Sequence, residues 1–182
     1  WAKKKRVLFY RGNEEDVMSR VLDAAKYYKV KHILNITGDC PLIDPQLISQ
    51  FINTYKSNNC EYLNNCKFRT YPIGMDIQIY PTKILEKSFK LTKKIKHREH
   101  VTLHILENPN LFKHLNMIAP PEIFFPKLGL TLDEINDYKL IKKIFLNFFK
   151  KRNSFSCLDI VNYLNQKPKL KLINIKVKRK KK

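Results

Sequence analysis

One aspartate stands where a predicted strand ends and the chain turns. The segment 35–45 reads N-I-T-G-D-C-P-L-I-D-P, so Asp39 follows a turn at Gly38. Ligands bind at the carboxyl ends of strands in open α/β sheets, and a carboxylate there suits a hard cation that bridges phosphates. We favour this interpretation over a turn-capping role for Asp39. In contrast, Asp44 followed by Pro45 is typical of a helix cap.

Two further carboxylates have more than one interpretation. Asp133 ends the run L-T-L-D just before the amphipathic segment 135–149. It therefore either binds a cation together with a distant carboxylate or caps the helix that follows, and both roles are compatible. Asp76 lies on the polar side of an alternating strand at 75–80. The alternation alone does not decide between a ligand contact and a solvated side chain.

Histidines and charged residues gather near position 100. His100 and His104 are four residues apart and would share a helix face, which is one arrangement for zinc. No cysteine or further histidine completes such a site at a usable spacing, so we do not favour zinc. The simplest interpretation of Arg98 and Glu99 is an exposed helix start, where a glutamate favours the positive end of the helix dipole.

Strand-like and helix-like periods alternate along the chain. We therefore expect an α/β fold, a three-layer sandwich with a mostly parallel sheet. Asn13 is the expected cap of the first helix, with Asp16 in capping-box position. The expected strands are 7–10, 32–37, 61–64, 75–80, 112–118 and 128–132, and the expected helices are 17–28, 45–55, 83–91, 100–108, 135–149 and one beginning at 156.

Length and composition predict one domain, residues 1–175, followed by a basic tail, residues 176–182, which we expect to be a frayed, solvated end. The net charge is +20, from 36 Lys+Arg against 16 Asp+Glu. Because the lysines are spread along the chain, a biased, solvated surface is favoured over a nucleic-acid groove. We find no apolar run long enough for a membrane and no secretory signal, and four cysteines without zinc spacing indicate reduced thiols, so we expect a cytoplasmic protein.

Five motifs follow one another along the chain: F-Y-R-G-N-E-E-D-V-M-S-R, I-T-G-D-C-P-L-I-D-P, Y-P-I-G-M-D-I-Q-I-Y, R-E-H-V-T and L-T-L-D. In this order they resemble one enzyme family, the spore-coat polysaccharide biosynthesis type of cytidylyltransferase, related to acylneuraminate and 3-deoxy-manno-octulosonate cytidylyltransferases. The resemblance runs from about Val7 to the C-terminal helix.

The resemblance implies a nucleotide-diphospho-sugar transferase fold that joins CMP from CTP to a sugar, usually an acidic one, for surface polysaccharide or glycan biosynthesis. It implies that Asp39 and Asp133 are catalytic and hold Mg²⁺, and that Asp76 faces the sugar. It also places the R-E-H-V-T motif on the substrate side, with a guanidinium suited to a sugar carboxylate or a phosphate. The substrate-side residues implied by it are Arg98, Glu99, His100 and Thr102, with Arg11 and Arg20 as weaker candidates.

Two departures from the family pattern stand out. The family opens with a Gly-, Arg- and Lys-rich loop that cradles the triphosphate, and nothing like it is present, so we expect an N-terminally truncated chain, inactive alone. Many relatives have an arginine where this chain has Gly129, and Lys127 is a poor substitute. The alternatives that stay open are a non-catalytic fragment and a basic nucleic-acid-binding module; a homodimer is also open.

Overall fold

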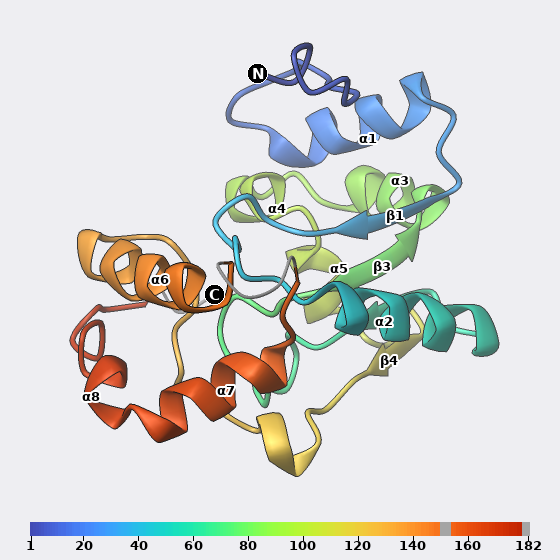
Figure 1. The fold of residues 1–182 in the computed structure, drawn as a ribbon. Helices are drawn as coiled ribbons and strands as arrows, with labels where there is room; N and C mark the ends of the chain where they lie inside the picture. Colours follow the sequence, from blue (N-terminus) through green and yellow to red (C-terminus); the bar gives the residue numbers. More distant parts are fainter. Residues whose placement is uncertain (150–153, 180–182) are drawn as a thin grey trace. The chain divides into compact units, whose positions relative to one another are not determined.

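The computed structural model describes residues 1–149 and 154–179 and has the mixed α/β architecture that the alternating periods predict (Figure 1). Its packing divides the chain into two compact units. The first unit comprises residues 1–34, 60–63 and 79–115, and the second comprises residues 35–59, 64–78 and 116–182. No helix in the described residues is long and apolar enough to cross a membrane.

Four short strands form one sheet in the order β1-β3-β2-β4. Their bounds are His32–Asn35 for β1, Tyr62–Asn64 for β2, Gln78–Pro81 for β3 and His114–Asn116 for β4. The sheet is mixed rather than purely parallel. Beside β1 and β3, Thr82 N donates to Lys31 O at 2.9 Å, and Asn35 faces Gln78, which is an antiparallel pairing. Strands β2 and β4 pair in parallel, because Glu61 N donates to Lys113 O at one end and Met117 N donates to Asn64 O at the other.

The prediction of a strand at 7–10 is wrong. Val7 N donates to Ala2 O at 3.1 Å, in a local turn, rather than to a strand. The side chains of Val7, Leu8 and Phe9 are 47%, 78% and 45% exposed, so this apolar run is not buried by a sheet. The expected strand at 128–132 is also reduced, to one bridge between Gly129 and Ile73.

Helix α1, Val17–Tyr27, begins one turn later than the expected cap. Asp16, not Asn13, is its N-cap and accepts a hydrogen bond from Ser19 N at 2.8 Å. The Asn13 side chain instead accepts from Glu15 N and Asp16 N, which closes the turn that leads into the helix. Both side chains compete with the helix backbone for N–H groups, and the one closer to the apolar repeat becomes the cap.

The first unit has its own core between α1 and the sheet. Helices α3 (Thr82–Leu91) and α4 (Ile95–Glu99) pack against α1, and α5 (Leu103–Glu107) packs against α3 (Figure 1). The apolar repeat predicted for α1 faces inward, with Leu22 buried and Val17 and Val21 partly buried against the same core. The buried cluster consists of Met18, Leu22, Tyr62, Tyr80, Ile84, Leu85, Val101, Ile105 and Phe112.

The second unit contains the remaining helices: α2 (Pro45–Ser57), η1 (Pro121–Ile123), α6 (Ile135–Phe148), α7 (Cys157–Gln166) and α8 (Pro168–Lys171). Asp44, as expected, caps α2, and its Oδ1 accepts from Gln46 N at 2.8 Å. Its second oxygen accepts from Cys157 N at 2.8 Å. One buried carboxylate therefore serves the first turns of two helices.

Candidate active site

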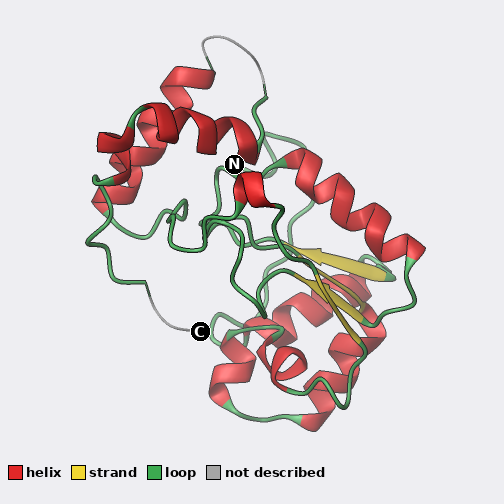
Figure 2. Cartoon of the chain, turned by 90° about the horizontal axis from the view of Figure 1, so that it is seen from below, coloured by secondary structure: helices red, strands yellow, loops and turns green. Residues whose placement is uncertain are grey.

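Loops, drawn in green in Figure 2, connect the short strands and the helices. All three candidate carboxylates lie in loops, including Asp76, which we expected on a strand. Main-chain hydrogen bonds bring these loops together within the second unit. Leu132 N donates to Asp39 O at 2.8 Å, so the I-T-G-D and L-T-L-D segments touch. Leu130 N donates to Ile73 O at 2.7 Å, which adds the Y-P-I-G-M-D segment. The structure therefore brings together three of the five motifs.

Gly74 explains how two of these loops approach so closely. Its φ is +104°, a backbone conformation that side chains disfavour. A Cβ at this position would lie 2.8 Å from the carbonyl carbon of Leu130. Glycine is required in Y-P-I-G-M-D because the main chain of the L-T-L-D segment occupies the space of a side chain.

Asp39 is exposed at the turn that the sequence predicts. The Thr37 hydroxyl donates to its Oδ1, which orients the carboxylate without covering it. The thiol of Cys40 lies 3.5 Å from the same oxygen. Burial, helped by the nearby carboxylates of Asp39 and Asp76, raises the pKa of Cys40 to about 12 despite the opposing Thr37 hydrogen bond. The thiol is therefore protonated and is not a nucleophile.

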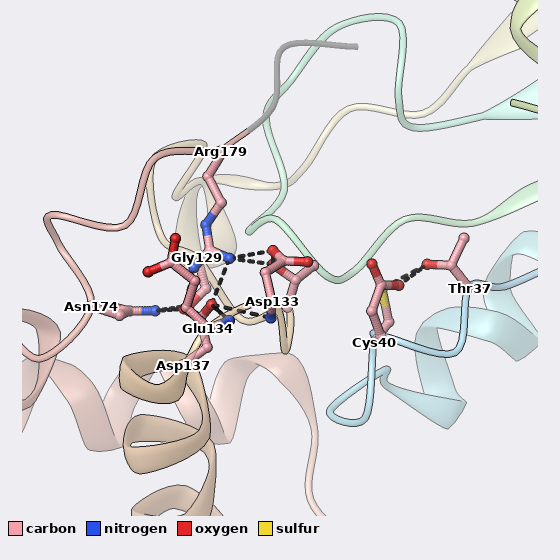
Figure 3. A network of polar contacts seen from close by, with 10 residues as sticks. Thr37, Cys40, Gly129, Asp133, Glu134, Asp137, Asn174 and Arg179 are labelled. Carbon is pink, nitrogen blue, oxygen red and sulfur yellow. Dashed lines mark hydrogen bonds and ion pairs between the residues drawn. The ribbon is translucent and has the colours of Figure 1, made fainter. Parts of the chain in front are cut away.

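Asp133 does not cap α6. Its Oδ2 accepts from Thr131 Oγ1 at 2.9 Å and from Arg179 Nη1 at 2.6 Å, and its side chain remains 47% exposed (Figure 3). Glu134 is instead the N-cap of α6, and its N–H donates to Asp137 Oδ2 at 3.0 Å. Since Glu134 and Asp137 form the capping box of this helix, Asp133 is available for another role.

Asp137 is fully buried and connects distant parts of the second unit. Its Oδ1 accepts from Asn174 Nδ2 at 2.8 Å and from Arg179 Nη2 at 2.5 Å. Burial raises the pKa of this carboxyl, but the hydrogen bonds from Arg179, Asn174 and the Glu134 main chain lower it more, and the result is a lowered pKa. The carboxylate is therefore charged and fully paired, as buried charges must be.

The third carboxylate of the site, Asp76, is also held by an arginine. Both its oxygens accept hydrogen bonds from Arg69, with Nη2 to Oδ2 at 3.0 Å, so the ion pair is bidentate. Asp76 is therefore not a freely solvated side chain on a half-buried strand. The contact fixes the position of this carboxylate, whereas contact with a sugar stays a prediction.

The R-E-H-V-T motif lies in the first unit, where Arg98 has internal partners. Its guanidinium lies 3.6 Å from the centroid of the Phe89 ring and donates to the carbonyl oxygens of Phe89 and Thr92 at 3.2 and 3.0 Å. It also pairs with Asp16 at 3.3 Å. These contacts join R-E-H-V-T to the motif that begins α1, and they favour a fold-stabilising role for Arg98.

The two neighbouring histidines are buried and hydrogen-bonded rather than arranged for a metal. His97 contacts Thr92 Oγ1 at 2.6 Å and Glu107 Oε2 at 2.8 Å, and His104 contacts Ser88 Oγ at 2.9 Å. Burial and the neighbouring charge of His97 lower the pKa of His104.

The other predicted substrate-side residues have differing environments. Glu99, His100 and Arg11 are exposed, and Thr102 is buried beside the hydroxyl of Tyr62 at 3.3 Å. Arg20 donates to Asn13 O at 2.7 Å, which is a structural contact at the start of α1. Their roles in binding stay predictions.

The carboxylates of the second unit fit a magnesium site. Among residues 1–149 and 154–179, no three or more His, Cys, Asp and Glu side chains form a metal-binding group. A protein-only cage is therefore absent from that part of the chain. Mg²⁺, however, typically binds one or two carboxylates and keeps its remaining ligands for water and phosphate. Asp39 and Asp133, both exposed and on touching loops, have this character.

Sequence reasoning missed four residues of the site: Arg69, Asp137, Asn174 and Arg179. Asp137 had a detectable signal, since it stands three residues after Glu134 at the spacing of a capping box. The expectation of a frayed, solvated tail is wrong for Arg179, which is ion-paired. Its partners are more than 40 residues away, so no local pattern revealed them.

Comparison with known proteins places this geometry in a family. The family model described as cytidylyltransferase matches residues 2–170. An uncharacterised protein of Methanocaldococcus jannaschii is 33% identical over 171 residues, which cover 94% of this chain and 68% of the relative. The spore coat polysaccharide biosynthesis protein SpsF of Bacillus subtilis is 27% identical over 164 residues, 87% of this chain and 65% of the relative. The chain thus spans about two thirds of the length of these relatives.

A solved structure agrees with this assignment. The structure of a cytidylyltransferase from Leptospira borgpetersenii superimposes with a TM-score of 0.88 and 33% identity, and the match covers all of this chain and 74% of that one. The fold is therefore shared along the whole of this chain. The chain belongs to the cytidylyltransferase family.

Proposed function

We propose that the protein transfers CMP from CTP to a sugar with an acidic group, and that Asp39 and Asp133 hold the Mg²⁺ for this reaction. The main-chain hydrogen bond of 2.8 Å between Leu132 and Asp39 carries the proposal, because it brings the loops of the two carboxylates together. Family membership and the similarity to SpsF support the use of CTP and a place in polysaccharide biosynthesis.

The proposed reaction is an in-line displacement at the α-phosphorus of CTP. A sugar hydroxyl oxygen forms a bond to that phosphorus, the bond to the bridging oxygen of the β-phosphate breaks, pyrophosphate leaves, and the hydroxyl proton passes to solvent. Bound Mg²⁺ would neutralise the charge that develops on the phosphate oxygens. Asp39, oriented by Thr37, and Asp133, oriented by Thr131, supply the two protein carboxylates.

The acceptor side of the proposal depends on Asp76. This carboxylate lies on the Y-P-I-G-M-D loop, beside the L-T-L-D segment. The two-pronged pair with Arg69 fixes its direction, so that it can accept hydrogen bonds from sugar hydroxyls. We propose that Asp76 contacts the sugar.

The test measures pyrophosphate release from CTP by the protein expressed from its complete reading frame, with Mg²⁺ and a panel of acidic and neutral sugars. Asp39→Asn and Asp133→Asn should each lower kcat/KM roughly 100-fold or more, since each removes a metal ligand. Asp23→Asn, an exposed carboxylate on α1, is the matched control and should retain activity. Full activity of Asp133→Asn would refute the metal assignment, and equal turnover of UTP would refute the specificity for CTP.

A further inference from the structure

Arg179, in the C-terminal segment (residues 172–179), occupies the space beside Gly129. A Cβ added to Gly129 would lie 2.3 Å from Arg179 Nη2 and 2.8 Å from its guanidinium carbon. The guanidinium therefore fills the volume that a side chain at position 129 would need. No positive φ accompanies Gly129, so this volume, rather than backbone strain, is what favours glycine here.

Side chains of the second unit fix this guanidinium on two sides. Nη2 donates to Asp137 Oδ1 at 2.5 Å, and Nη1 donates to Thr131 Oγ1 and Asp133 Oδ2, both at 2.6 Å. Five residues before it, Asn174 donates to Asp137 Oδ1 and to the main-chain oxygen of Gly129 at 2.9 Å. The C-terminal segment is thus attached at two points to the loop that carries Asp133 (Figure 3).

The charges explain why a cation belongs at this position. Asp39, Asp133 and Asp137 would together present three negative charges, and Asp137 is fully buried. Arg179 compensates the buried charge, which would otherwise be costly. Two net negative charges remain, the number that matches one divalent cation. In addition, the guanidinium binds Oδ2 of Asp133 and leaves the other oxygen of this half-exposed carboxylate toward solvent.

We propose that Arg179 is a positioning residue for the divalent cation. Its guanidinium lies beside Gly129 and orients the Asp133 carboxylate so that this carboxylate can bind the cation. The same guanidinium compensates the negative charge of Asp137. The inference rests on the proposed function, because it assumes that Asp133 is a metal ligand. Groups that hold metal ligands in place typically change metal affinity 10- to 100-fold when they are removed. The C-terminal segment is then part of the site.

The experiment measures Mn²⁺ binding directly, by electron paramagnetic resonance of the free ion. It uses the protein expressed from its complete reading frame, and CTP is left out. Arg179→Ala should weaken Mn²⁺ binding about 10-fold or more. Arg179→Lys keeps the positive charge but cannot donate to Asp133 and Asp137 at the same time in the geometry of a guanidinium, so it should recover only part of the Mn²⁺ affinity. Lys178→Ala removes an exposed neighbouring cation and serves as the control, with unchanged binding. Circular dichroism checks that each variant is folded.

A second variant reaches the same arginine without deleting it. Gly129→Ala introduces the Cβ that collides with the guanidinium, so it should weaken Mn²⁺ binding as Arg179→Ala does. The double variant should bind no more weakly than either single variant, because both remove the same contact.

The outcomes separate this inference from the proposed function. Unchanged Mn²⁺ binding by Arg179→Ala overturns the inference, since the guanidinium would then not position the ligand. Tighter binding also overturns it, since the guanidinium would then compete with the cation. Full recovery by Arg179→Lys, or unaltered binding by Gly129→Ala, also overturns it. Mn²⁺ binding that Asp133→Asn does not weaken, or an absence of Mn²⁺ binding by the wild-type protein, overturns both. Binding that depends on Asp133 in a protein that does not turn over CTP overturns the proposed function only.

Discussion

Two arginines, one in each unit, have opposite surroundings. Arg98 donates to two main-chain carbonyl oxygens and stacks on Phe89, so most of its hydrogen-bonding capacity closes the polypeptide onto itself. Within residues 1–149 and 154–179, Arg179 donates only to side chains, and one of these, Asp133, is 47% exposed. A guanidinium that satisfies carbonyl oxygens stabilises a fold, whereas one beside an exposed carboxylate borders a place where a ligand can bind.

The two networks also differ in what their disruption should change. Loss of Arg98 contacts should appear in stability, and loss of Arg179 contacts should appear first in metal affinity. Asp137 should affect both stability and metal affinity, because its side chain is buried and also pairs with Arg179.

The largest effect on stability is expected for Asp137→Ala. The substitution leaves Arg179 without its buried partner and removes the acceptor for Glu134 N and Asn174. We expect the free energy of unfolding to fall by about 4 kcal/mol, the usual cost of breaking a buried ion pair. Urea unfolding at pH 7 measures it. Lys139→Ala, an exposed position on the same helix, should change stability by less than about 0.5 kcal/mol. A loss below 1 kcal/mol for Asp137→Ala, roughly the worth of a surface pair, would show that the network is solvated.

A somewhat smaller loss is expected for Arg98→Ala. The side chain is 16% exposed and pairs with Asp16, and its removal also leaves two carbonyl oxygens without their donor. We expect the free energy of unfolding to fall by about 3 kcal/mol, with Arg11→Ala, an exposed arginine, as the control. Unchanged stability together with a raised KM for the sugar would reverse the comparison and return Arg98 to the substrate side.

The smallest effect concerns Glu107, beside His97. Hydrogen bonds from Lys96 and His97 lower its pKa from 4.5 to about 2. Because the folded-state pKa is the lower one, the ionised carboxylate stabilises the protein above pH 4.5, and this contribution is lost as the pH falls from about 4.5 toward 2. The side chain is 39% exposed, so screening keeps the contribution below about 1 kcal/mol.

The corresponding variant is Glu107→Gln. Its free energy of unfolding, measured from pH 2 to pH 7, should fall less steeply than that of the wild type below pH 4.5. If the free energies of unfolding of Glu107→Gln and the wild type fell equally steeply with pH, Glu107 would be solvated in the folded protein. Its contacts with Lys96 and His97 would then not stabilise the first unit.

Local patterns predicted most helices of both units. Period-3.6 repeats located α1, α2, α3, α6 and α7, and the helix expected to begin at 156 is α7, whose N-cap is Ser156. The alternating run 75–80 predicted the inward side chains Met75, Ile77 and Ile79, although only Gln78–Pro81 pairs as β3. Strand pairing depends on a partner chain segment, which periodicity does not reveal.

The site was predicted in part, for a related reason. Asp39 and Asp133 were identified from motifs, and the structure places their loops in contact. Arg179 and Asn174 were not, because their partners are Asp137 and Gly129, at least 37 residues away. The R-E-H-V-T motif predicted a substrate contact for Arg98, but a motif does not distinguish a side chain that binds ligand from one that holds the motif's own backbone.

The double cap formed by Asp44 has a consequence for the order in which the second unit assembles. Its two oxygens bind the first turns of α2 and α7, and the contact to Cys157 spans 113 residues of sequence. So distant a contact requires closure of a long loop, and we expect it to form late in folding. Asp44 should therefore control how fast the native protein opens rather than how fast it forms. Its replacement by alanine should accelerate unfolding and hardly slow refolding.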